Sequence, residues 1–246
     1  MAILKRMKLI LFDIDGTLID SGGAGSRSLD LAFKEIFGID DAFTRIEMAG
    51  KTDPQILREA FLLHGIDGSD DVMPSFFQTY TGFLRDCVNN PGGHVKPGVA
   101  KALADLSEKE DIVLGLLTGN IEEGARIKLQ RYGLYSYFRT GVFGSDSEDR
   151  NELLPIAVAR LFRKSAVSVK YECCVVIGDT PRDIDCARLH GALAVGVATG
   201  PYTVEALTDA GADVVFTDLS DTARLISLIN RTGWEDPEAR ASTCLS

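Results

Sequence analysis

The 246-residue chain has comparatively few basic side chains and no long apolar run. Its 26 Lys and Arg residues face 36 Asp and Glu residues, which gives a formal net charge of −10 at pH 7. A chain without a basic tract is not expected to bind a nucleic-acid backbone or an anionic membrane surface. No apolar stretch approaches the roughly 18 residues that span a bilayer. The sequence therefore predicts a cytoplasmic protein, with no nucleic acid and no membrane among its partners.

Cysteine and histidine are also scarce, with five and three residues in the chain. The cysteines are odd in number and show no Cys-x-x-Cys spacing, and no histidines have the spacing of metal ligands. A disulfide framework and a zinc site are therefore not indicated. We expect free thiols instead, and those of Cys173 and Cys174 are expected to be buried because both lie in an apolar run.

The chain does contain many short apolar runs, separated by amphipathic segments. Runs of this length that are rich in Val, Ile and Leu are typical of strands buried on both faces of a parallel sheet. The runs cover residues 8–12, 112–117, 142–143, 173–177, 193–197 and 214–216. The helical segments that alternate with them cover residues 99–107, 121–132, 152–162, 181–190, 203–210 and 219–229. This alternation predicts an α/β fold with a Rossmann-like, doubly wound parallel sheet.

One stretch interrupts the alternation directly after the first strand. Residues 26–37, 54–64 and 72–88 have helical patterns, and no strand is predicted among them. The chain then returns through a segment rich in turn residues. We therefore predict a core domain formed by residues 1–20 and 94–246, and a helical cap domain formed by residues 21–93. A cap inserted there would lie over the carboxyl ends of the strands, where open α/β sheets bind ligands.

Two of the predicted strands end in polar residues that suit catalysis. Asp13 and Asp15 close the first strand, and their period of two directs both to one side before Gly16 turns the chain. The same Asp-x-Asp-Gly pattern is also typical of a simple turn after a strand. The strand at 112–117 is followed by Thr118-Gly119-Asn120, a pattern that an ordinary helix N-cap would also explain.

A third strand, at 173–177, leads into Asp179 and Asp183. Pro181 would let Asp179 or Thr180 act as a helix cap, so each pattern taken alone has a structural explanation. Together, however, they place acidic residues at one edge of one sheet. Like charges gathered there repel unless a cation holds them, and carboxylate oxygens are ligands that Mg²⁺ prefers. The sequence therefore predicts a Mg²⁺ site.

With these motifs in this order, the sequence resembles the haloacid dehalogenase (HAD) superfamily of phosphohydrolases. Within it, the sequence is similar to the branch of phosphoglycolate phosphatases and β-phosphoglucomutases. The resemblance covers nearly the whole chain and rests on residues 13–18 (DIDGTL), 117–120 (LTGN) and 178–184 (GDTPRDI). It implies a Mg²⁺-dependent phosphatase that hydrolyses a small phosphomonoester, phosphoglycolate-like or a sugar phosphate, through an aspartyl-phosphate intermediate.

The resemblance also implies a role for each motif residue. Asp13 would be the nucleophile, and Asp15 would protonate the leaving group and later activate water. Thr118, with Gly119 and Asn120 beside it, would hold a phosphoryl oxygen.

The same resemblance implies the metal ligands. Asp13, the main-chain carbonyl of Asp15, and Asp179 would bind Mg²⁺. Asp183 would support the metal from a second layer or through water.

The family places a basic residue, usually a lysine, between its second and last motifs. Residues 143–152 contain no lysine, so Arg150 is the candidate, with a planar fork in place of an ammonium group. Lys164 and Lys170 fit solvated surface charges better. Residues 47–54 resemble the Gly-basic-Thr-Asp loop of the family's caps, which makes Lys51 a candidate contact to the leaving group. A glycine turn followed by a helix cap would explain the same loop.

Two alternative functions remain open on the sequence. A mutase of the β-phosphoglucomutase type would transfer the phosphoryl group to a sugar hydroxyl. Such mutases carry a histidine in the early cap helix, whereas residues 21–26 read SGGAGS. A non-catalytic phosphate-binding module is the other alternative, although every expected acidic position is filled. We expect a small phosphorylated metabolite as the partner, and a monomer or weak homodimer.

Overall fold

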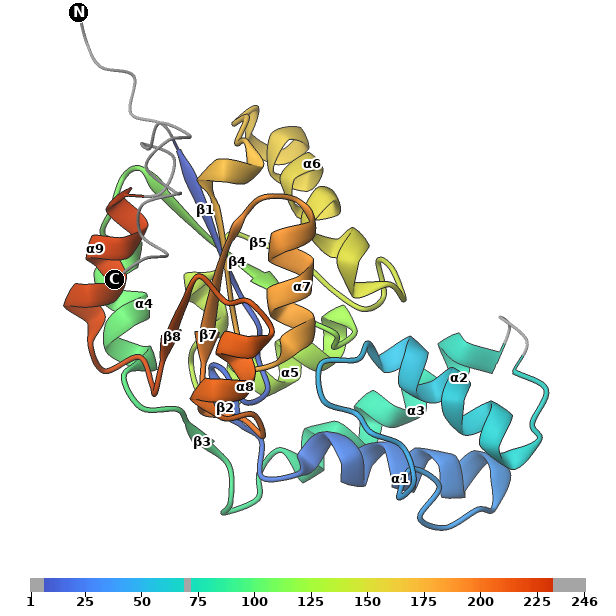
Figure 1. The fold of residues 1–246 in the computed structure, drawn as a ribbon. Coiled ribbons are helices and arrows are strands. Elements are labelled where there is room, and N and C mark those ends of the chain that lie inside the picture. The colour runs from blue at the N-terminus through green and yellow to red at the C-terminus, as the bar shows by residue number, and fades with distance from the viewer. Residues whose placement is uncertain (1–6, 69–71, 232–246) are drawn as a thin grey trace, which may run out of the picture.

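A parallel sheet of six strands forms the centre of the protein (Figure 1). The structure is a computed structural model, and it describes residues 7–68 and 72–231. The strand order is β5-β4-β1-β6-β7-β8, so the chain runs outward from β1 first on one side and then on the other. The strands are β1 Lys8–Phe12, β4 Ile112–Leu117, β5 Thr140–Val142, β6 Cys174–Gly178, β7 Leu193–Val197 and β8 Val214–Phe216. This arrangement confirms the predicted doubly wound α/β fold.

Helices cover both faces of the sheet, which explains why the strands are apolar on both sides. In the central strand β1, Ile10 and Phe12 pack into one buried cluster, and Leu9 and Leu11 pack into the other. The first face carries α4 Val99–Ser107, α5 Glu122–Arg131 and α9 Thr222–Arg231. The second face carries α6 Leu153–Ser165, α7 Pro181–Leu189 and α8 Val204–Asp209.

The helical insertion after the first strand forms a group of helices beside the sheet (Figure 1), and it has a hydrophobic core of its own. It contains α1 Ala24–Phe37, α2 Asp53–His64 and α3 Val72–Cys87. Phe33 lies at its centre, with its ring centroid 6.1 Å from that of Phe61 and 6.0 Å from that of Phe76. One helix from the sheet region contributes to this core, because Ile121 and Ile127 of the α5 segment pack there. The insertion and the sheet region therefore share an apolar contact beside the carboxyl edge of the sheet.

A short feature that the sequence patterns did not indicate joins the two regions. The strands β2 Ile19–Asp20 and β3 His94–Val95 pair in an antiparallel ribbon at the two chain crossings. Two residues are too few to show a period, which is why the prediction missed them. Short 3-10 turns also occur at η1 Tyr135–Tyr137, η2 Arg150–Glu152 and η3 Tyr171–Cys173.

Other expectations concern cysteines and membranes. Within the described ranges no disulfide is formed, and Cys173 and Cys174 are buried as predicted. None of the helices in the described part of the chain combines the length and apolar character that a membrane crossing requires. Cys244 lies outside the described residues.

Candidate active site

The carboxyl ends of β1, β4 and β6 meet beneath the helical insertion, where they border a cavity of about 290 Å³. Both regions of the protein contribute to its walls. The sheet side supplies Asp13, Asp15, Thr118, Gly119, Asn120, Lys128, Arg150 and Asp179, and the insertion supplies Gly25, Ser26, Leu29, Met48, Lys51, Asp53, Ile56 and Tyr80. The cavity thus brings the predicted site residues together, apart from Asp183, which lies just behind its wall.

The turn after β1 depends on Gly16. This residue has a φ of 84°, in the left-handed region that favours glycine. A side chain at this position would also collide with the carboxylate of Asp179. The glycine therefore lets the β1 turn and the end of β6 approach each other, which brings Asp13 and Asp179 to one place.

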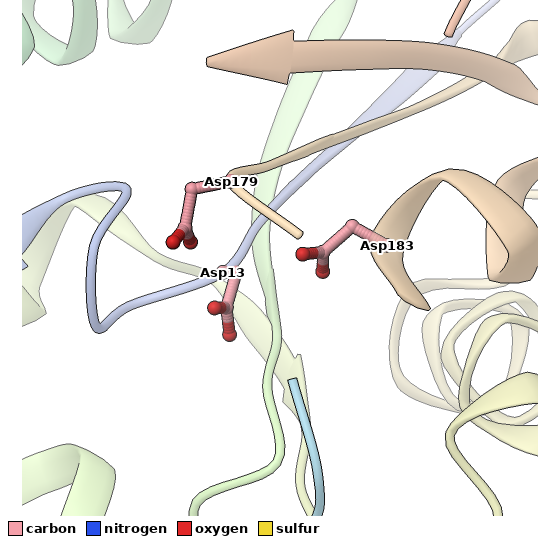
Figure 2. A group of neighbouring side chains, drawn as sticks. All are labelled: Asp13, Asp179 and Asp183. Carbon is pink, nitrogen blue, oxygen red and sulfur yellow. The ribbon is translucent and has the colours of Figure 1, made fainter. Parts of the chain in front are cut away.

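Asp13, Asp179 and Asp183 form a buried carboxylate cluster, with one oxygen of each lying within 4.8 Å of the others. Figure 2 shows the three side chains facing one another from the end of β1, the end of β6 and the start of α7. Burial raises the pKa of Asp13 to about 6, against the opposing effect of Arg150. Burial, with Asp13 and Asp183 nearby, raises the pKa of Asp179 as well. Buried, closely spaced hard oxygens of this kind fit a divalent cation such as Mg²⁺.

The cluster members differ in how many of their oxygens are already engaged. Asp179 accepts a hydrogen bond from the Thr17 hydroxyl at 2.9 Å. Asp183 accepts hydrogen bonds at Oδ2 from the Thr180 amide and hydroxyl, and at Oδ1 from Arg150. Thr180 is the N-cap of α7, as one form of the alternative explanation required, and Asp183 completes its capping box while also reaching the cluster. With both oxygens in use, it is better placed to orient its neighbours than to bind a metal directly.

Arg150 lies against the cluster, with its guanidinium 3.1 Å from Asp13 and 2.5 Å from Asp183. Its side chain is only 6% exposed. Burial disfavours the charged form, but Asp183 and Asp13 outweigh it and raise the pKa of Arg150. Another nitrogen donates to the Gly50 carbonyl of the insertion at 3.2 Å. Its Nε atom is buried and has no hydrogen-bond partner among the described residues.

Thr118 and Asn120 form a linked pair at the end of β4. The buried Thr118 hydroxyl accepts from the Asn120 side-chain amide at 2.9 Å, and that amide also donates to Asp15 Oδ2 at 2.9 Å. Between them, Gly119 packs so closely against the insertion that a side chain there would collide with the Lys51 carbonyl. These hydrogen bonds connect Thr118 and Asn120 at the end of β4 to Asp15 at the end of β1.

The loop at Lys51–Asp53 contacts the sheet side of the site. Asp53 accepts a hydrogen bond from the Ile121 amide at 2.8 Å, and burial raises the pKa of Asp53 to about 6. Thr52 donates to the Glu148 carbonyl at 3.0 Å while also capping α2. The loop is therefore both a helix cap and a contact between regions. Lys51 borders the cavity, but its ammonium pairs with Glu59 at 2.6 Å.

A second buried cation in the site, Lys128, was not among the predicted site residues. Its ammonium lies 2.6 Å from Asp15 Oδ2 and 2.6 Å from Asn120 Oδ1. Burial alone would lower the pKa of Lys128, but Asp15 and Asp53 raise it. The sequence did contain a signal, since Lys128 lies three residues after the buried Ala125 and next to the buried Leu129 on an amphipathic helix. A lysine on an apolar face needs a partner.

Comparisons with known proteins agree with this geometry. A sequence profile of the haloacid dehalogenase-like hydrolases matches residues 7–191. A phosphoglycolate phosphatase of Synechococcus elongatus is 30% identical over 92% of this chain and 100% of its own length. A phosphoglycolate phosphatase of Rhodospirillum rubrum is 28% identical over 87% of this chain and 88% of its own. Among solved structures, a hydrolase from Pseudomonas syringae has a TM-score of 0.69 at 24% identity, covering 91% of this chain and 99% of that one.

Proposed function

Because the chain belongs to the haloacid dehalogenase-like hydrolases, we propose that it is a Mg²⁺-dependent phosphatase that hydrolyses a small phosphomonoester through a phosphorylated Asp13. The observation that carries this proposal is the buried cluster of Asp13, Asp179 and Asp183 with Arg150 beside it. A carboxylate nucleophile, acidic side chains that can bind a cation and a fixed guanidinium are the groups that phosphoryl transfer needs.

In the first step, Asp13 attacks phosphorus and the ester oxygen leaves. Arg150, which borders the cavity, offsets the negative charge that nucleophile and phosphoryl oxygens bring together. The Thr118 hydroxyl, at the end of the neighbouring strand β4, holds another phosphoryl oxygen. When bound by Asp13, Asp179 and the Asp15 carbonyl, Mg²⁺ would neutralise the transferring group and keep these carboxylates ionised.

Asp15 handles the proton in both steps. It donates a proton to the departing oxygen, and as a carboxylate it then takes a proton from the water that hydrolyses the aspartyl-phosphate. Burial opposes ionisation of Asp15, but the Lys128 ammonium and hydrogen bonds from Lys128 and Asn120 lower its pKa. The base form needed for the second step is therefore favoured in this site.

The cavity and the relatives support a phosphoglycolate-like substrate. A volume of about 290 Å³ suits a small leaving group, and two relatives at 28% and 30% identity are named phosphoglycolate phosphatases. None of the described residues that line the cavity is a histidine, which favours hydrolysis over transfer to a sugar hydroxyl. Lys51 remains our candidate for contact with the leaving group.

The test is a kinetic screen with Mg²⁺ over phosphoglycolate, glycerol 2-phosphate, glucose 6-phosphate, β-glucose 1-phosphate and 4-nitrophenyl phosphate. We expect release of free phosphate, abolished by EDTA and in the Asp13→Asn variant. Turnover that persists in Asp13→Asn purified free of other phosphatases would refute the nucleophile assignment. Conversion of β-glucose 1-phosphate into an isomer without phosphate release would identify a mutase instead.

A further inference from the structure

Lys128 is a buried cation to which the first step of the reaction outlined above assigns no role. Its side chain is 5% exposed and projects from α5 into the cavity wall. Removing an ammonium group from water costs several kcal/mol unless its partners compensate. A lysine at this place therefore needs close partners, and those partners indicate what it does.

Those partners connect Lys128 to the proton-transfer residue. Its ammonium donates to Asp15 Oδ2 and to Asn120 Oδ1, and the Asn120 amide donates to the same Oδ2 of Asp15. The three side chains thus form a closed triangle of hydrogen bonds. The amide of Asn120 is oriented by this triangle, because its oxygen must face the ammonium and its nitrogen must face the carboxylate.

The triangle fixes the orientation of the Asp15 carboxylate. The Asp15 side chain is 39% exposed, and without partners it would sample several rotamers. Lys128 and Asn120 both donate to Oδ2, and the Ser21 side chain is a further hydrogen-bond partner of this carboxylate. Helix α1 closes the space on another side, since a side chain at Gly25 would lie 3.3 Å from the Lys128 ammonium.

The two buried cations of the site are divided between the two catalytic carboxylates. Arg150 contacts Asp13 and Asp183, whereas the hydrogen-bonding partners of Lys128 are Asp15 and Asn120. A charge that served mainly to neutralise the phosphoryl group would be expected beside the nucleophile. Lys128 lies beside the acid instead.

We propose that Lys128 is a positioning residue that holds Asp15 for proton transfer to the leaving-group oxygen. This inference rests on the proposed phosphatase function. It predicts that Lys128 matters most for esters whose leaving group must be protonated. An alkoxide needs a proton as it departs, whereas 4-nitrophenolate is stable enough to leave without one.

The test compares two substrates in the Lys128→Met variant, which keeps the length of the side chain but not its charge. For the alkyl ester hydrolysed fastest in the screen above, we expect kcat/KM, which reports the steps up to departure of the leaving group, to fall about 100-fold, within the usual range for general acid catalysis. For 4-nitrophenyl phosphate we expect a fall of less than about fivefold, because general acid catalysis contributes little to that step. The ratio of the two rates does not depend on the folded fraction, so partial misfolding cannot imitate the result. Lys101→Met, at a lysine that is 68% exposed on α4, is the control and should leave the ratio unchanged.

A double variant adds an independent measurement. If Lys128 acts through Asp15, adding Lys128→Met to Asp15→Asn should reduce alkyl-ester turnover no further. Equal losses on both substrates, no loss on either, or a further tenfold loss in the double variant would each overturn the assignment. Those outcomes leave the phosphatase function intact, whereas absence of Mg²⁺-dependent turnover in the unchanged protein would overturn both proposals.

Discussion

Replacing Arg150 by alanine should strongly destabilise the metal-free protein, and it should reduce the phosphatase activity measured with Mg²⁺. The guanidinium is 6% exposed and pairs with the buried Asp13 and Asp183 at 3.1 and 2.5 Å. Removing one partner of a buried ion pair leaves an uncompensated charge, which typically costs about 3–5 kcal/mol. Losing a donor that stabilises the transition state should lower kcat/KM by about 100- to 1000-fold. Arg150→Lys should recover part of both losses, because it restores the positive charge but not the planar guanidinium that pairs with two carboxylates.

The loss of stability should depend on pH and on Mg²⁺. Burial raises the pKa of Asp13 to about 6 while Arg150 opposes the shift, so removing Arg150 raises this pKa further. Asp13 contributes fully to the loss of stability only at a pH above its own pKa in the Arg150→Ala variant. This contribution shrinks as the pH falls toward 6 and is absent below about 6, where Asp13 is protonated in both proteins. Added Mg²⁺ should reduce the loss at pH 8, because a second cation then neutralises the cluster.

Urea unfolding at pH 8 and pH 5, each with EDTA and with Mg²⁺, measures these effects, and 4-nitrophenyl phosphate kinetics measures the activity. Arg126→Ala is the matched control, since Arg126 pairs with Glu123 at the surface with side chains 39% and 34% exposed. That change should cost less than about 1 kcal/mol. An unfolding free energy for Arg150→Ala within about 1 kcal/mol of the unchanged protein at pH 8 in EDTA would refute the reasoning.

Three further predictions address the metal site, the contact between Gly119 and the insertion, and the leaving-group contact. Mg²⁺ at a hundred times its Kd should stabilise the protein by about 2.7 kcal/mol in thermal scans, and Asp179→Asn should lose most of this gain; an equal gain would contradict the metal site. Gly119→Ala should lower kcat/KM because the new side chain collides with the Lys51 carbonyl, whereas the control Gly82→Ala, in open space on α3, should keep activity and add up to about 1 kcal/mol. Lys51→Ala should raise KM roughly tenfold, or about 1.4 kcal/mol, with little change in kcat; an unchanged KM would remove Lys51 from the site.

The structure agreed best with predictions that rest on local pattern. The strands around Asp13, Thr118 and Asp179 were predicted within one residue, because a short run of β-branched and aliphatic residues that ends in turn residues is the local signal of a buried strand. The α9 helix, in contrast, begins at Thr222 and not at residue 219, because helix ends depend on capping contacts that a periodicity does not contain.

For the site, too, residues that depend on local pattern could be predicted, and residues that depend on distant contacts could not. Asp13 and Asp179 could be predicted because each follows a strand, and parallel strands end at one edge of a sheet. Lys128 could not be predicted in this way, because its partner Asp15 lies 113 positions away on another element. A lysine in a helical pattern is typical of a solvated surface. Only the packing of α5 against the insertion makes this one buried.

The sequence alone determined the order of strands and helices along the chain, the insertion after β1 and the acidic ends of the strands. Each of these follows from residues close together in the chain. The tertiary structure decided which charges meet: Arg150 with Asp13 and Asp183, and Lys128 with Asp15. Such pairs form only when the strand order brings distant turns together and burial removes the water that would otherwise screen the charges.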